Sequence, residues 1–112
     1  MQTAVFEQAI NQFAKDINLN AIDKGQWEKK TIGEAFFLVN TELAEAYEAM
    51  RKGTDKSPSE HIGLFTQIEE EIADAIIRLL DVAAHFNLRI GEAMTNKHAF
   101  NKTRPYLHGK KF

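Results

Sequence analysis

Two pairs of carboxylates, each with a three-residue spacing, are the residues of this chain best suited to chemistry. Glu42 and Glu45 form the first pair, and Glu71 and Asp74 form the second. Both pairs lie in segments of helical periodicity, and residues three apart on a helix share a face. If the two helices pack together, each pair of acids at ~5 Å and a dielectric of ~20 costs about 3 kcal/mol. A cation would offset this repulsion, so the spacing predicts a divalent metal site, and a phosphate compound is the substrate we expect for that metal.

The ligand types narrow the choice of metal. Di-iron bundles add Glu-x-x-His motifs to their helix-borne glutamates, and none of the four histidines here has an acid three residues before it. Zinc favours histidine or cysteine ligands, but the chain has no cysteine and no HExxH motif. An all-oxygen site therefore indicates Mg²⁺, with Mn²⁺ as the alternative.

The elements that must position these acids are predicted to be helices. Apolar residues recur at steps of three and four over about residues 3–22, 31–53, 57–86 and 90–102. Thr31 and Glu34 fit a capping box at the start of the second helix, and Gly53 fits its end. A second box at Ser57–Glu60, with proline at the first helical position, predicts the start of the third helix.

No segment alternates with period two, and no linker or repeat divides the chain. We therefore expect an all-α fold of four helices in a single domain over residues 1–112. The third helix has an unusually broad apolar face, made by Ile68, Ile72, Ile76, Leu79, Leu80 and Ala83. One small bundle would not cover this face, so we expect a bundle completed by oligomerisation, as a homodimer or homotetramer.

The charge is unevenly distributed along the chain. Residues 1–88 carry 8 basic and 15 acidic side chains, whereas residues 89–112 carry six basic and one acidic. The basic segment has two interpretations. It binds an anion that a metal holds from the other side, or it is a solvated tail, and composition leaves both open. Positive charge confined to one end argues against a nucleic acid polymer as partner. The absence of cysteine, of a long apolar run and of a signal sequence predicts a cytoplasmic location without membrane association.

The residues around both acidic pairs resemble the MazG-like superfamily of all-α nucleoside triphosphate pyrophosphohydrolases. The pattern Glu42-x-x-Glu45, then 25 residues, then Glu71-x-x-Asp74 is similar to the superfamily's four-acid signature. The block from Lys97 to Pro105, with His108–Lys111 after it, resembles the superfamily's basic C-terminal block. The resemblance extends from about residue 27 to the end of the chain.

The resemblance implies hydrolysis of a nucleoside triphosphate (NTP or dNTP) to the monophosphate and pyrophosphate. By analogy, Glu42, Glu45, Glu71 and Asp74 ligate Mg²⁺, and one glutamate of the first pair orients or deprotonates the attacking water. Lys97, Asn101 and Arg104 would hold phosphate oxygens, with Arg104 able to make bidentate contacts.

Two further residues have alternative roles at this stage. Trp27 either stacks on the nucleobase or caps the core. Arg78, one turn after Asp74, either binds phosphate or holds Glu45 or Asp74 in a salt bridge. Two alternatives to the leading function also stay open. One is a phosphoribosyl-ATP pyrophosphohydrolase of the same superfamily, and the other is a non-catalytic helical oligomer that binds metal.

Overall fold

The structure, a computed structural model, describes residues 2–109 and confirms the all-α prediction. Its helices are α1 (Thr3–Asp23), α2 (Ile32–Lys52), α3 (Gln67–His85) and α4 (Ile90–Lys102), followed by the short 3₁₀ helix η1 (Tyr106–Gly109). Within the described residues no β-strand occurs, and one isolated bridge joins Pro58 to Thr66. None of the described helices is long and apolar enough to cross a membrane. The cytoplasmic location stays a prediction.

Local signals in the sequence set most helix ends. The Thr31 side chain accepts from the Glu34 backbone N–H and the Glu34 side chain bonds back, so the predicted capping box is present. Gly53 ends α2 in the left-handed region at φ 77°, where glycine has no Cβ penalty. Asn87, at φ 54°, occupies the left-handed region just after α3. The predicted bounds of α4 agree with those observed.

The predicted start of the third helix is wrong, because α3 begins ten residues after Ser57. Thr66 and Glu69 form the capping box that is used, and both of its hydrogen bonds are present. The backbone N–H groups of the preceding segment bond within a loop instead: Ser59 donates to Phe65 and Gln67 donates to Ser57. Both Ser57–Glu60 and Thr66–Glu69 fit the capping pattern. The backbone bonds of the loop place the first in the loop, so the helix begins at the second. The segment between α2 and α3 is therefore a long loop.

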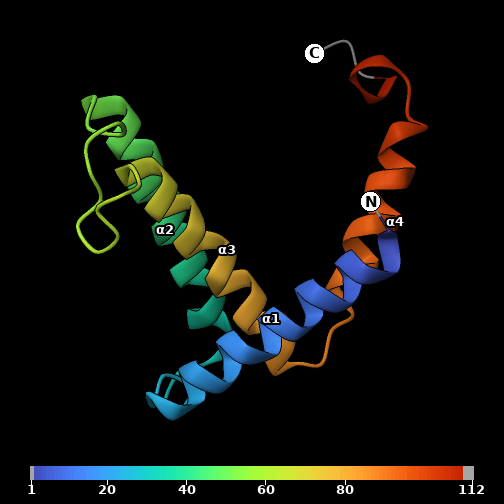
Figure 1. The fold of residues 1–112 in the computed structure, drawn as a ribbon, viewed down its shortest axis with the longest axis horizontal. Helices are drawn as coiled ribbons and strands as arrows, with labels where there is room; N and C mark the ends of the chain where they lie inside the picture. The colour runs from blue at the N-terminus through green and yellow to red at the C-terminus, as the bar shows by residue number, and fades with distance from the viewer. Residues whose placement is uncertain (1, 110–112) are drawn as a thin grey trace.

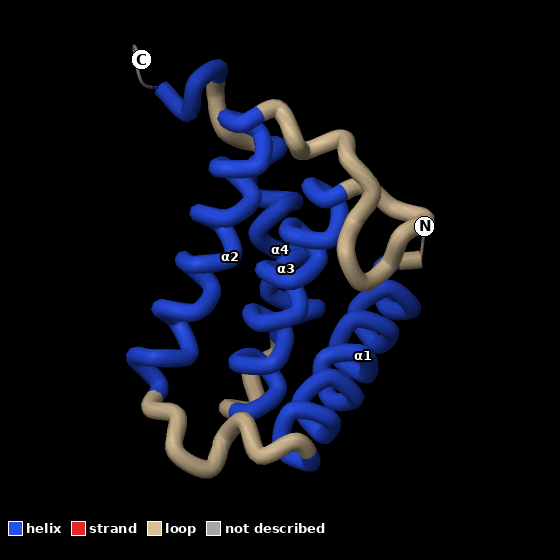
Figure 2. The backbone as a smooth tube through the Cα atoms, turned by 90° about the vertical axis from the view of Figure 1, so that its left-hand side faces the viewer, coloured by secondary structure: helices blue, strands red, loops and turns tan. Residues whose placement is uncertain are grey.

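The four helices form two arms of a V (Figure 1). Helices α2 and α3 pack antiparallel as one arm, α1 packs against α3, and α4 packs on α1 to complete the other arm. A view from the side places α1 and α2 on either side of α3 (Figure 2). Helix α3 is therefore the element on which the arms meet.

Small residues dominate the core. Of the ten buried apolar side chains in the described part of the chain, seven are alanines: Ala14, Ala21, Ala35, Ala46, Ala49, Ala75 and Ala83. Alanine at a helix seam lets two backbones approach closely but buries little apolar area per residue. The close packing of α2 on α3 brings their acidic residues together, and it leaves many large apolar residues outside the core.

The α1–α4 contact is equally close. A Cβ built on Gly91 would lie 2.6 Å from the backbone oxygen of Glu7, so only glycine fits at this position. The Gly91 backbone N–H donates to Asn11 Oδ1 at 2.8 Å, and Asn11 Nδ2 donates to Glu92 Oε1 at 2.7 Å. These bonds fix α4 on the N-terminal half of α1.

Candidate metal centre

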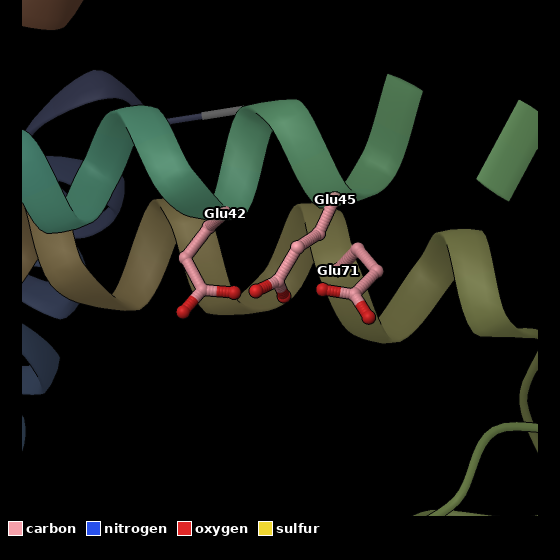
Figure 3. Close-up of side chains that lie close together, drawn as sticks. All are labelled: Glu42, Glu45 and Glu71. Atoms are coloured by element: carbon pink, nitrogen blue, oxygen red, sulfur yellow. The ribbon is translucent and has the colours of Figure 1, made fainter. Parts of the chain in front are cut away.

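Three of the four predicted acids gather in one cluster. Glu42 and Glu45 from α2 and Glu71 from α3 each offer a carboxylate oxygen, and the three oxygens lie within 4.8 Å of one another. The three side chains extend to the same side of the helix pair (Figure 3). The alanine-lined seam positions them, because Ala46 and Ala49 on α2 and Ala75 on α3 are all buried beside the acids. The three-residue spacing of Glu42 and Glu45 then turns both acids toward Glu71.

The cluster lacks a positive partner at Glu71. Its Oε2 atom is buried without a hydrogen-bond partner in the described chain. Burial first, then the hydrogen bond and charge of Glu45 and the charges of Glu42 and Asp74, raise the pKa of Glu71 to about 7. An orphaned carboxylate oxygen facing two further acids fits a divalent cation with hard oxygen ligands. The residues present therefore fit Mg²⁺ or Mn²⁺.

Asp74 lies beside the cluster and outside the set of three. It lines the same cavity of about 390 Å³ as Glu42, Glu45 and Glu71. Burial, followed by the charges of Glu42 and Glu70, raises the pKa of Asp74 above its usual value. Asp74 therefore belongs to the same electrostatic site, although its oxygens do not complete the three-carboxylate group.

Arg78 forms a salt bridge within the site. Its Nε donates to Glu42 Oε1 at 2.9 Å, and Glu42 is only 8% exposed. The geometry favours the positioning role over phosphate binding, although the partner is Glu42 rather than Glu45 or Asp74. The guanidinium fixes one oxygen of Glu42, and no salt bridge among residues 2–109 involves Glu45 or Glu71.

The sequence did not identify His61 as a residue of this site. His61 lines the cavity with the acids, and its Nδ1 lies 2.7 Å from Glu70 Oε2. The hydrogen bond and charge of Glu70 raise the pKa of His61, and the same bond lowers the pKa of Glu70. The sequence analysis places residues 57–66 in the third helix. The structure has a loop there instead, and this loop brings His61 against Glu70 of α3.

Trp27 takes part in a buried polar network around Asp81, nearer the C-terminal end of α3. Its Nε1 donates to both carboxylate oxygens of Asp81, at 3.1 and 3.0 Å. Its ring stacks on His85 with centroids 3.7 Å apart, and the Lys30 Nζ lies 4.3 Å from its centroid. Asn18 Nδ2 donates to Asp81 Oδ1 at 2.8 Å. These contacts favour the core-capping role for Trp27.

The predicted phosphate-binding residues lie elsewhere within one chain. Lys97, Asn101 and Arg104 belong to α4 and the turn after it, on the arm opposite the α2–α3 pair (Figure 1). Lys97 and Arg104 both lie over the ring of Phe100, at 4.8 and 5.8 Å from its centroid. A single chain therefore does not bring this basic set to the acidic cavity.

Comparison of the chain with protein-family models, with curated proteins and with solved structures finds no significant match. The resemblance to the MazG-like superfamily therefore stays a prediction, carried by the acidic pairs and the basic block. The geometry on its own establishes a cluster of acids suited to a divalent metal.

Proposed function

We propose that the protein is a Mg²⁺-dependent nucleotide pyrophosphohydrolase that converts a nucleoside triphosphate to the monophosphate and pyrophosphate. One observation carries the proposal: Glu71 Oε2 is buried beside the acids of α2, and no described residue bonds to it. A purely structural carboxylate would be expected to have a donor. The resemblance in sequence supplies the substrate class.

The proposed roles follow from the surroundings of each side chain. Glu42, Glu45 and Glu71 would hold Mg²⁺, with Asp74 beside them. Bound Mg²⁺ would neutralise charge on the phosphate oxygens and lower the pKa of a coordinated water. Glu45 is the exposed member of the cluster and is placed to orient or accept a proton from water. Arg78 would hold Glu42 in its ligating position.

The test is a panel of NTPs, dNTPs and modified nucleotides, each incubated with Mg²⁺ and assayed for pyrophosphate. We expect pyrophosphate, not phosphate, from at least one nucleotide. Glu45→Gln should abolish the activity without changing the circular dichroism spectrum. Glu48→Gln is the matched control, because Glu48 lies one turn further on α2 and already pairs with Arg51 at 2.8 Å. A Glu45→Gln protein that is as active as an active Glu48→Gln control would reject the catalytic assignment of Glu45.

Phosphoribosyl-ATP belongs in the same panel as the alternative substrate. If phosphoribosyl-ATP alone is cleaved, the proposed reaction type stands and phosphoribosyl-ATP is the substrate.

A non-catalytic metal-binding oligomer is favoured by one observation, the separation of Lys97, Asn101 and Arg104 from the cavity within one chain. Calorimetry separates the two functions. An enzyme should bind Mn²⁺ more tightly when a non-hydrolysable nucleotide is present, whereas a structural site should bind Mn²⁺ equally with and without nucleotide.

The proposal includes a homodimer or homotetramer. If the basic set binds phosphate at the acidic cavity, a second copy must supply it, because α4 packs on α1 in its own chain. Mixing Glu45→Gln with Arg104→Ala tests this point. Each variant alone should be inactive. If one copy supplies the acids and the other supplies the basic set, subunit exchange should restore part of the activity, because some sites then contain both native residues.

A further inference from the structure

Among the described residues that line the acidic cavity, His61 is the one whose side chain can carry positive charge. Six carboxylates line the same cavity, and they belong to Glu42, Glu45, Glu60, Glu70, Glu71 and Asp74. A metal held by three of these acids would leave the others facing the phosphate groups of a bound nucleotide. A cation in the wall would offset that repulsion, and the imidazole of His61 is the group placed to supply it.

Two bonds to Glu70 hold His61 in a defined orientation. Its backbone N–H donates to Glu70 Oε1 at 3.3 Å, and its Nδ1 lies 2.7 Å from Glu70 Oε2. A carboxylate only accepts, so Nδ1 carries the proton of this contact. The ring nitrogen Nε2 is left for another partner, since it makes no hydrogen bond within residues 2–109. The Glu70 side chain is 15% exposed and that of His61 is 71% exposed, so the anchor is covered while the ring stays accessible to an anion.

The loop that carries His61 is closed by its own hydrogen bonds. The backbone N–H of Gln67 donates to the Ser57 oxygen at 2.8 Å, and that of Ser59 donates to the Phe65 oxygen at 2.9 Å. Ser59 is only 6% exposed, and its hydroxyl accepts from the Ile62 backbone N–H at 3.0 Å. These bonds fix the chain on both sides of His61. Ordering the imidazole on an anion therefore costs less than it would in an open loop.

Resting on the function proposed above, we propose that His61 is a phosphate-binding residue of the acidic cavity, which donates from Nε2 to a phosphate oxygen of the metal-bound nucleotide. Glu70 is its positioning residue. The imidazolium donates from Nδ1 to Glu70 and from Nε2 to the phosphate, and a charge-assisted bond of this kind is stronger than a neutral one. The bond and charge of Glu70, with the charges of Glu60 and Asp74, raise the pKa of His61 and so favour this charged form.

This role gives a single chain a phosphate contact that its basic C-terminal block does not provide. Lys97, Asn101 and Arg104 lie on the arm opposite the α2–α3 pair (Figure 1). His61 lies on the loop between α2 and α3 and lines the cavity of the same chain. Phosphate binding through His61 is therefore independent of any residue that a second copy supplies.

The first test titrates the Mg²⁺-saturated protein with inorganic pyrophosphate in a calorimeter. His61→Ala should weaken pyrophosphate binding at least about tenfold, the usual loss for a hydrogen bond to a charged group. Its affinity for Mn²⁺ alone should equal that of wild type, because His61 is outside the group of three acids. His98→Ala is the matched control, since His98 is an exposed histidine on α4 and should change neither affinity. Unchanged pyrophosphate affinity in His61→Ala, or no pyrophosphate binding by wild type, would overturn the proposal.

The second test distinguishes a contact with phosphate from a contribution to loop structure. His61→Arg keeps a charged donor and should bind pyrophosphate to within about threefold of wild type, whereas His61→Asn should be as weak as His61→Ala. Equal losses in all three variants would mean that His61 acts only by holding the loop, and would overturn the proposal.

The nucleotide panel separates this proposal from the proposed function. On any nucleotide that wild type cleaves, His61→Ala should raise KM at least about tenfold with a smaller change in kcat, as expected for loss of a contact made before the transition state. If wild type is active and the variant has an unchanged KM, the role of His61 is wrong and the hydrolase stands. If wild type binds pyrophosphate through His61 but cleaves no nucleotide, the phosphate site stands and the hydrolase is wrong.

Discussion

Helix α3 carries two acids in opposite situations, ten residues apart. Asp81, 6% exposed, accepts hydrogen bonds from Trp27 and Asn18, and Lys30 Nζ lies 3.9 Å from its Oδ2. Glu71 faces other carboxylates, and one of its buried oxygens has no donor among the residues that the structure describes. Breaking the bonds of a buried, paired acid is costly, whereas a buried acid without partners destabilises the fold until a cation binds it. The two ends of one helix thus carry a paired acid and an unpaired acid, and the unpaired one is the acid proposed to bind metal.

Removing the paired acid should have the largest effect on stability. Asp81→Ala leaves the Trp27 N–H, the Asn18 amide and the Lys30 charge without their acceptor. We expect the free energy of unfolding in urea to fall by about 3 kcal/mol. Asp81→Asn keeps one acceptor oxygen and should lose less. Mn²⁺ affinity of the folded protein should be unchanged, and a loss below about 1 kcal/mol would show that the network contributes little.

Removing the unpaired acid should change stability in the opposite direction. Glu71→Gln removes a charge that burial and the neighbouring acids disfavour. At pH 8 without metal we expect the free energy of unfolding to rise by about 1–2 kcal/mol. Calorimetry should show loss of Mn²⁺ binding in the same variant. Lower stability together with intact metal binding would indicate that Glu71 is a structural acid like Asp81.

The pH dependence should separate the metal-free and metal-bound protein. The pKa of Glu71 is raised from 4.5 to about 7 in the folded state, so folding favours its protonated form. Stability is therefore lost as pH rises from about 4.5 through 7, where the folded protein must release this proton. In EDTA the Tm should fall across this range more steeply for wild type than for Glu71→Gln. Saturating Mg²⁺ should remove the difference, because the metal binds the ionised form.

Local geometry explains why the sequence could predict that Glu42, Glu45 and Glu71 lie close together. The i, i+3 spacing determines which way Glu42 and Glu45 point, and the capping box at Thr31 and the glycine at Gly53 determine where their helix begins and ends. The same kind of reasoning predicted the bounds of α4.

Long-range contacts were beyond such reasoning. The choice between two capping boxes depended on backbone bonds that close the loop before α3. Trp27 joins Asp81 across 54 residues and Arg78 joins Glu42 across 36, and nothing in local spacing selects these partners. The position of α4 depends on the fit of Gly91 against Glu7. Each of these features requires the packing of helices that are distant in sequence.

The smallest expected effect concerns His61, whose pair with Glu70 ties the loop before α3 to the rim of the acidic cavity. The pair is solvent-exposed on the histidine side, so its contribution is modest and screened by salt. The pKa of His61 is raised by Glu70, so the contribution is present below about pH 6.5 and is lost as pH rises through the folded-state pKa. His61→Gln should therefore lower the Tm slightly at pH 5.5 and leave it unchanged at pH 8.5. The His61 backbone N–H also donates to Glu70, and the variant keeps this bond at both pH values. Amide hydrogen exchange in residues 57–66 should therefore accelerate in the variant only at the lower pH, where it has lost the charged imidazole. An equal change at both pH values would mean that His61 acts through packing, and that the loop is held independently of charge.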